Sequence, residues 1–271
     1  MTEEIVIAVG CDPNGCDAEQ QMVLEYSLKK NSTIPYRIEW MKLSKDPNSF
    51  WYSDGDEGWN TKKWSTPFSG FRWAVPEFCD FRGKAIYCDA DFIFLTDIKK
   101  LVEQEFTGNS IAMAKGGGSW RFCLTFWDNV KARNVMPSIT QHRGIESLHQ
   151  QLMSQFAQNT QLVQPFVGNW NCVDGEGMSI GEIDALHYSD MRTQFSHKYS
   201  VPRLESQNQN HWFDGEIKDH PRQDLVDLFD QYYSEAIESG MSVSDYTPND
   251  RFGEISKQTQ KGYTTAHFGK L

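Results

Sequence analysis

Residues 83–98 read GKAIYCDADFIFLTDI, and this stretch decides the fold that the sequence predicts. Residues 84–88 form a short apolar run, typical of a strand that is buried on both faces of a parallel sheet. The run ends in Asp89-Ala90-Asp91. We therefore expect a buried strand that delivers two carboxylates to the carboxyl edge of an open α/β sheet, which is where such sheets bind ligands.

The N-terminal segment extends this prediction. Residues 5–9 are another apolar, β-branched run, and the turn residues 10–15 follow it. Apolar positions at helical spacing predict a helix over residues 19–30, and residues 36–41 are typical of a second strand. The order strand, loop, helix, strand favours a parallel α/β sheet, although the dinucleotide-binding pattern GxGxxG is absent from the sequence.

Further elements are predicted toward the C-terminus. Residues 110–114 and 122–126 are candidate strands, and an amphipathic helix is expected to begin after Gly144. A last helix is predicted between Pro221 and Gly240, which are typical start and stop residues. Residues 44–66 carry several tryptophans in a long polar stretch, which is consistent either with a ligand-facing loop or with a loop anchored on the domain.

Composition limits the possible partners. The 271 residues contain 37 acidic and 26 basic side chains, a formal net charge of −11. This charge disfavours non-specific binding to nucleic acid or to anionic lipid. The N-terminus shows no signal-peptide pattern, no apolar run is long enough for a membrane helix, and the six cysteines show no CxxC spacing. We expect a cytoplasmic protein with reduced thiols and no membrane anchor.

Asp89 and Asp91 are the most informative pair of candidate site residues. Side chains two positions apart on an extended segment point to the same side, and only the small Ala90 separates them here. Two carboxylates in such a place favour a hard divalent cation such as Mg²⁺ or Mn²⁺, which completes its coordination with substrate phosphates. On spacing alone, a strand that ends in a solvated Asp turn is an equal alternative.

Four segments together resemble family 8 glycosyltransferases, which are retaining GT-A enzymes related to glycogenin and to bacterial glycosyltransferases. The segments occur in that family's order, and the similarity covers residues 5–197. They are residues 66–76 (TPFSGFRWAVP), residues 83–98 with Asp-Ala-Asp, residues 169–171 (NWN) and residues 187–195 (HYSDMRTQF). The resemblance implies a Rossmann-like α/β domain with a central, mostly parallel sheet flanked by helices.

The resemblance also implies which residues form the site. Asp89, Asp91 and His187 are expected to bind Mn²⁺ or Mg²⁺, and Arg72 is expected to contact the nucleotide sugar, with Asp89, Asp91 and Arg72 as catalytic residues. The full set of expected donor-binding residues is Gly10, Cys11, Asp12, Arg72, Asp89, Ala90, Asn171 and Arg192. Two alternatives stay open: Arg72 as a partner of Glu77 or Asp80, and His267 in place of His187 as the metal ligand.

One segment departs from the family pattern. The family's His-aromatic-x-Gly-x-x-Lys-Pro-Trp segment has Asp190 in place of the glycine here, and Thr193, Gln194 and Phe195 in place of Lys-Pro-Trp. The family's lysine pairs with the donor diphosphate, so one cation is missing. Arg192, His197 and Lys198 are the nearby candidates to replace it.

The function implied by the resemblance is transfer of a hexose from a UDP-sugar to a glycan or another hydroxyl acceptor, with retention of anomeric configuration. The acidic candidates for a covalent nucleophile are Asp174, Glu176 and Asp184, and front-face transfer without such a nucleophile is the favoured alternative. A non-catalytic binder of nucleotide sugars or carbohydrate and a sugar nucleotidylyltransferase remain as other classes.

The chain is expected to divide into a catalytic domain and an extension. Residues 1–198 would form the nucleotide-sugar-binding domain, and residues 199–271 a C-terminal helical extension packed on it. Within the extension, His211 and Trp212 are open to three interpretations: an acceptor subsite, a dimer contact or a lid on the sheet. The sequence leaves the oligomeric state open.

Overall fold

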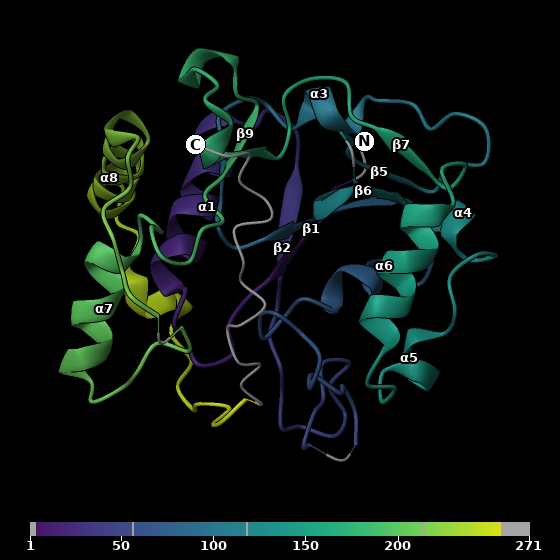
Figure 1. Cartoon of the computed structure of the whole chain (residues 1–271), viewed down its shortest axis with the longest axis horizontal. Helices are drawn as coiled ribbons and strands as arrows, with labels where there is room; N and C mark the ends of the chain where they lie inside the picture. The colour runs from purple at the N-terminus through teal and green to yellow at the C-terminus, as the bar shows by residue number, and fades with distance from the viewer. Residues whose placement is uncertain (1–3, 56, 118, 214, 256–271) are drawn as a thin grey trace.

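A computed structural model describes residues 4–55, 57–117, 119–213 and 215–255 of the chain. Strands and helices alternate through the N-terminal half, and the C-terminal half contains longer helices and short strands (Figure 1). The strands are β1 (Ile5–Gly10), β2 (Tyr36–Met41), β3 (Lys84–Asp89), β4 (Phe92–Phe94), β5 (Ala112–Lys115), β6 (Arg121–Asp128), β7 (Val163–Pro165), β8 (Cys172–Val173) and β9 (Ala185–His187). The α-helices are α1 (Ala18–Asn31), α2 (Val75–Phe78), α3 (Lys99–Val102), α4 (Asn129–Ala132), α5 (Ile139–His142), α6 (Leu148–Gln158), α7 (His197–Ser206) and α8 (Gln223–Glu238).

Two sheets organise the described chain. The larger has the order β2-β1-β3-β6-β5-β7, in which β1 runs parallel to β2 and β3, β6 is antiparallel to both of its neighbours, and β7 is parallel to β5. The smaller has the order β4-β9-β8. The central sheet is therefore mixed and mostly parallel with flanking helices, which confirms the α/β fold class predicted from the sequence.

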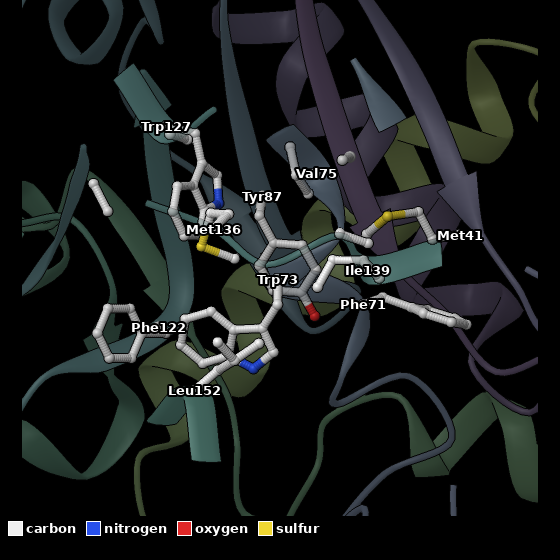
Figure 2. Packing of buried hydrophobic residues seen from close by; sticks show 14 of the residues in the cluster. Met41, Phe71, Trp73, Val75, Tyr87, Phe122, Trp127, Met136, Ile139 and Leu152 are labelled. Carbon is white, nitrogen blue, oxygen red and sulfur yellow. The ribbon is translucent and has the colours of Figure 1, made fainter. Parts of the chain in front are cut away.

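Each face of the larger sheet has its own apolar core. On one face, Trp73, Tyr87, Phe122 and Trp127 pack together with Leu152 of α6 (Figure 2). The other face is covered by α1 and the smaller sheet, whose buried side chains meet those of β1, β3 and β6. Because both faces are buried, β1 and β3 carry nearly continuous apolar runs, and those runs are the signal that predicted them.

The tryptophan-rich segment 44–66 anchors itself on the first of these faces. Trp51, Trp59 and Trp64 are all buried and all pack against Phe71. Phe71 lies in the short 3₁₀ helix η1 (Phe71–Trp73). These three tryptophans are therefore part of the core and anchor the segment, while Ser65 and Thr66 at its end line the cavity described below.

Helices α7 and α8 follow the last strand and lie on the α1 side of the sheet (Figure 1). Leu225, Phe229 and Tyr232 form the buried stripe of α8, and Tyr232 meets Tyr26 of α1 edge to face. Short 3₁₀ turns η2 (Asp174–Glu176), η3 (Ile180–Glu182) and η4 (Val243–Tyr246) complete the elements. Among the described residues, no helix has the length and apolar character needed to cross a membrane.

Candidate active site

Asp89 is the last residue of β3 and stands beside Gly10, the last residue of the parallel strand β1. Parallel strands end at the same edge of a sheet, so both residues lie at the carboxyl edge where α/β folds bind ligands. A cavity of about 290 Å³ opens there. Asp89, Asp91, Arg72 and His187 all line it, which brings together four of the residues that the sequence analysis selected.

Asp89 is buried but has polar partners. Arg72 Nη2 donates to both carboxylate oxygens at 3.3 Å, and Tyr87 Oη donates to Oδ1 at 2.5 Å. Burial raises the pKa of Asp89, and the positive charge of Arg72 opposes that rise. Arg72 thus pairs with Asp89 rather than with Glu77 or Asp80. A buried ion pair of this kind contributes little net stability but positions its members.

His187 is held by Asn171, which the sequence analysis expected at the donor. Asn171 Nδ2 donates to the backbone oxygen of Arg121 at 3.2 Å, so its Oδ1 faces His187 Nδ1 at 3.0 Å and accepts from it. The neutral imidazole therefore carries its proton on Nδ1 and a lone pair on Nε2, the form that binds metals. The left-handed backbone of Asn171, with φ of 57°, aims the amide at the ring.

Asp91 lies next to His187, with its Oδ1 3.4 Å from His187 Nε2. Its other oxygen, Oδ2, accepts from Gln194 Nε2 at 3.1 Å. Oδ1 is buried and has no hydrogen-bond partner. Gln194 occupies the region in which the family has Lys-Pro-Trp, so in this chain a neutral amide contacts the second carboxylate.

Three donor atoms lie within 4.8 Å of one another, and they come from Asp89, Cys123 and His187. Asp91 stands beside this group through its contact with His187. Together, two carboxylates, one of which has an unpartnered oxygen, an imidazole nitrogen with a free lone pair and a thiol form a donor set that fits a divalent cation. Burial raises the pKa of the Cys123 thiol to about 12.

The expected residues of the first loop lie away from the cavity wall. Cys11 is buried, with its thiol donating to Val9 O, and Asp12 caps its own loop by accepting from the amides of Asn14 and Cys16. A Cβ at Gly10 would stand 2.7 Å from Tyr87 Oη. The glycine is thus required by packing against Tyr87, the residue that holds Asp89. Ala90, Asn171 and Arg192 are likewise outside the described lining.

The three cations proposed to replace the family's lysine are engaged elsewhere. Arg192 pairs with Asp190, Lys198 pairs with Asp230, and His197 Nε2 contacts Met191 O at 2.6 Å. Arg121 lines the cavity instead and forms an ion pair with Glu176. Its position on β6 carried no motif, so the sequence offered no signal for it.

Other lining residues also escaped selection from the sequence. His149 accepts from Trp73 Nε1 at 2.9 Å, and burial lowers its pKa to about 3, so it is a neutral imidazole. Asp17 enters from the start of α1, and His211 and Trp212 enter from the segment after α7. The last two were noticed as an aromatic cluster, and the fold places them on the wall of the cavity. His267 lies outside the described residues.

Several solved structures of glycosyltransferases share this arrangement of strands and helices. The bifunctional glycosyltransferase WbbM aligns over 89% of this chain and 52% of its own, with 12% identity and a TM-score of 0.56. GlyE of Streptococcus pneumoniae TIGR4 aligns over 93% of this chain and 67% of its own, with 15% identity and a TM-score of 0.54. The galactosyltransferase LgtC, solved with donor and acceptor sugar analogues, aligns over 85% of this chain and 96% of its own, with 10% identity and a TM-score of 0.52.

The fold is that of the GT-A glycosyltransferases. At these identities the likeness concerns the fold, and this chain spans about half the length of WbbM. Protein CDI of Arabidopsis thaliana is 34% identical over 99 residues, which are 36% of this chain and 35% of that protein. No family model matches the sequence.

Proposed function

We propose that this protein is a metal-dependent glycosyltransferase that moves a hexose from a UDP-sugar to a hydroxyl acceptor with retention. The observation that carries the proposal is the cluster of metal-donor side chains at the carboxyl end of β3, inside the cavity of a GT-A fold. The resemblance to family 8 supports the finer parts: the UDP-sugar, the retained configuration, and the choice of Mn²⁺ or Mg²⁺.

In this proposal Asp89, Asp91 and His187 hold the cation. Bound there, the cation would neutralise the charge that develops on the departing nucleoside diphosphate. Arg72 orients Asp89, because its guanidinium contacts both carboxylate oxygens, and its positive charge opposes the rise in the pKa of Asp89 that burial causes. Asn171 keeps the lone pair of His187 directed at the site through the hydrogen bond to Nδ1.

Arg121 is the cation we assign to the role of the missing lysine. It lines the cavity, and its partner Glu176 leaves it 19% exposed as a side chain. A guanidinium can bind a phosphate through two parallel hydrogen bonds, whereas a lysine offers a point charge. When the donor binds, Arg121 would leave Glu176 and pair with an oxygen of the diphosphate.

Retention is best explained by front-face transfer, in which the departing phosphate takes the proton of the acceptor hydroxyl. A covalent route needs a carboxylate that can reach the sugar. Asp174 forms a hydrogen bond with His220, and Asp184 accepts one from the backbone amide of Asn169. Glu176 forms an ion pair with Arg121. Among the described residues, the carboxylates that line the cavity are Asp17, Asp89 and Asp91. None of the three proposed nucleophiles is in that set.

The test is release of nucleoside diphosphate from a panel of UDP- and GDP-sugars with Mn²⁺, with Mg²⁺ and with EDTA. We expect UDP release from one sugar that EDTA abolishes. Retention is checked by the anomeric configuration of the product on a model acceptor alcohol. Absence of turnover, together with absence of binding of UDP in the presence of Mn²⁺, would overturn the proposal.

The same assay separates the other two classes. A sugar nucleotidylyltransferase would release pyrophosphate from a nucleoside triphosphate and a sugar phosphate, and the loop over residues 10–15 lacks the basic side chains typical of such enzymes. A binding protein would bind UDP-sugar without turnover. For residues 199–271 we infer an extension that packs on the catalytic domain, in keeping with the contact of α8 with α1.

A further inference from the structure

Cys123 is the one member of the donor group that the resemblance to family 8 did not select. We propose that Cys123 is a direct ligand of the bound cation and that it turns the site's preference from Mg²⁺ toward thiophilic divalent ions such as Zn²⁺ and Co²⁺. This inference rests on the proposed metal site and adds to it a ligand and an order of metal preference.

The register of the sheet brings Cys123 to this position. Strand β6 runs antiparallel to β3, with Tyr87 opposite Thr125 and Cys88 opposite Leu124, so Cys123 stands one step further on, next to Asp89. Side chains that face each other across an antiparallel pair lie on the same side of the sheet. Cys123 therefore shares the cavity side with Asp89, and its sulfur lies within 4.8 Å of the donor atoms of Asp89 and His187.

The guanidinium of Arg72 lies against both Cys123 and Asp89. Arg72 Nη1 lies 3.7 Å from Cys123 Sγ, while Arg72 Nη2 contacts Asp89. One guanidinium thus offers positive charge both to the carboxylate and to the sulfur. When the cation binds, the S–H bond breaks, the proton leaves to solvent, and a metal–sulfur bond forms, so the reaction needs neither an oxidant nor a reductant.

The donor set decides the preference. Oxygen-only sites suit Mg²⁺, whereas a site with one carboxylate, one imidazole and one thiolate is typical of Zn²⁺ and other borderline ions. In the general affinity order of divalent first-row ions Mn²⁺ stands lowest and Co²⁺ stands above it, and a thiolate ligand also selects for Zn²⁺. Mn²⁺ remains compatible because Asp89, Asp91 and His187 supply oxygen and nitrogen donors.

The experiment titrates the full-length protein, freed of metal by EDTA and dialysis, with Co²⁺ alone. A thiolate bound to Co²⁺ gives an intense near-ultraviolet charge-transfer absorption that carboxylate and imidazole ligands do not produce. We expect this absorption in the unmodified protein and its loss in Cys123→Ser. Cys79→Ser is the matched control, because Cys79 is also partly buried and lies outside the cavity, and it should keep the absorption.

Competition completes the test. Cys123→Ser should weaken Zn²⁺ binding by at least about tenfold, since even partners in the outer shell of a metal cost 10- to 100-fold. The Mg²⁺ affinity of this variant should stay within about twofold of that of the unmodified protein, because a thiolate contributes little to the binding of a hard ion. Retained ultraviolet circular dichroism shows that the variant is folded.

Two results would overturn the inference. One is Co²⁺ binding detected by calorimetry without the charge-transfer absorption; the other is an absorption that persists in Cys123→Ser. In both cases metal-dependent UDP release could still be observed, so the proposed function would survive. If the unmodified protein binds neither Co²⁺ nor Mn²⁺, with or without UDP, the metal site itself is refuted and both proposals fail.

Discussion

Phe71 and Arg72 are neighbours in η1, yet they serve two buried regions of opposite character. Phe71 packs into an aromatic cluster with Trp51, Trp59 and Trp64, with ring centroids 4.7 to 5.2 Å away. Arg72 points into the cavity, where Asp89, Cys123 and His187 meet. One short turn of chain thus joins the apolar core to the polar site.

The two regions differ in whether the burial of their side chains is favourable by itself or must be offset by contacts with partners. In the aromatic cluster, removal of apolar surface from water is favourable by itself. In the polar cluster each buried group loses its hydration and depends on its partners. Changes in the first region are therefore expected to lower stability and leave ligand binding intact. Changes in the second should impair ligand binding, with an added loss of stability where a buried charge loses its partner. The following predictions test that contrast.

The largest effect is expected in the polar cluster. Asp89→Asn combined with Asp91→Asn removes both carboxylate charges and should lower metal-dependent UDP release about a thousandfold, since a Lewis-acid cation contributes several kcal/mol. The measurement is the initial rate with Mn²⁺. The unfolding midpoint is expected to fall, because Arg72 loses its charged partner, so a cooperative thermal transition serves as the control for folding. Full, metal-independent activity of this variant would contradict the assignment.

The matching change in the aromatic cluster is Trp59→Ala. Trp59 is 2% exposed, so its truncation should cost about 3–5 kcal/mol of unfolding free energy, measured by urea denaturation. UDP affinity in the presence of Mn²⁺, measured at low temperature where the variant is folded, should be unchanged. Trp212→Ala, on the cavity wall, should leave the unfolding free energy nearly unchanged and weaken UDP binding. Equal losses of unfolding free energy in the two variants would contradict the proposed difference between the aromatic cluster and the cavity.

A smaller effect is expected from the residue that orients the imidazole. Asn171→Gly keeps the left-handed backbone but removes the acceptor for His187 Nδ1. Loss of such a partner costs about 10- to 100-fold in metal affinity, which a Mn²⁺ titration would measure. Asn171→Asp keeps an acceptor and should restore most of the affinity. A purely structural role for Asn171 would leave Mn²⁺ affinity unchanged in the glycine variant.

The smallest effect concerns pH. Burial and the neighbouring Asp12 raise the pKa of Asp17 from 3.8 to about 7. Between these values the folded protein holds a proton that the unfolded chain has released, so stability falls as pH rises through this window. The urea concentration at the unfolding midpoint should fall as the pH rises from 5 to 7.5, and Asp17→Asn should reduce this fall. Asp250→Asn, an exposed control, should keep it, and an identical slope in all three proteins would refute the assignment.

The sequence alone determined the fold class and selected the two carboxylates that we propose as metal ligands. The runs that form β1 and β3 are largely apolar because these strands are buried on both faces of a sheet, and this makes them visible without structure. Asp89 and Asp91 were visible because they follow such a run directly. Local signals of this kind depend only on neighbours along the chain.

Tertiary structure decided which further residues join the site and which contacts its members make. Cys123 joins Asp89 through strand register, Arg121 reaches the cavity from β6, and Asn171 acts on His187 across 16 positions. The tertiary structure also shows that Trp51, Trp59 and Trp64, which the sequence left as candidate ligand contacts, belong to the core. These assignments depend on contacts between segments far apart in the chain, because burial and pairing are set by three-dimensional packing and leave no pattern in the spacing of residues.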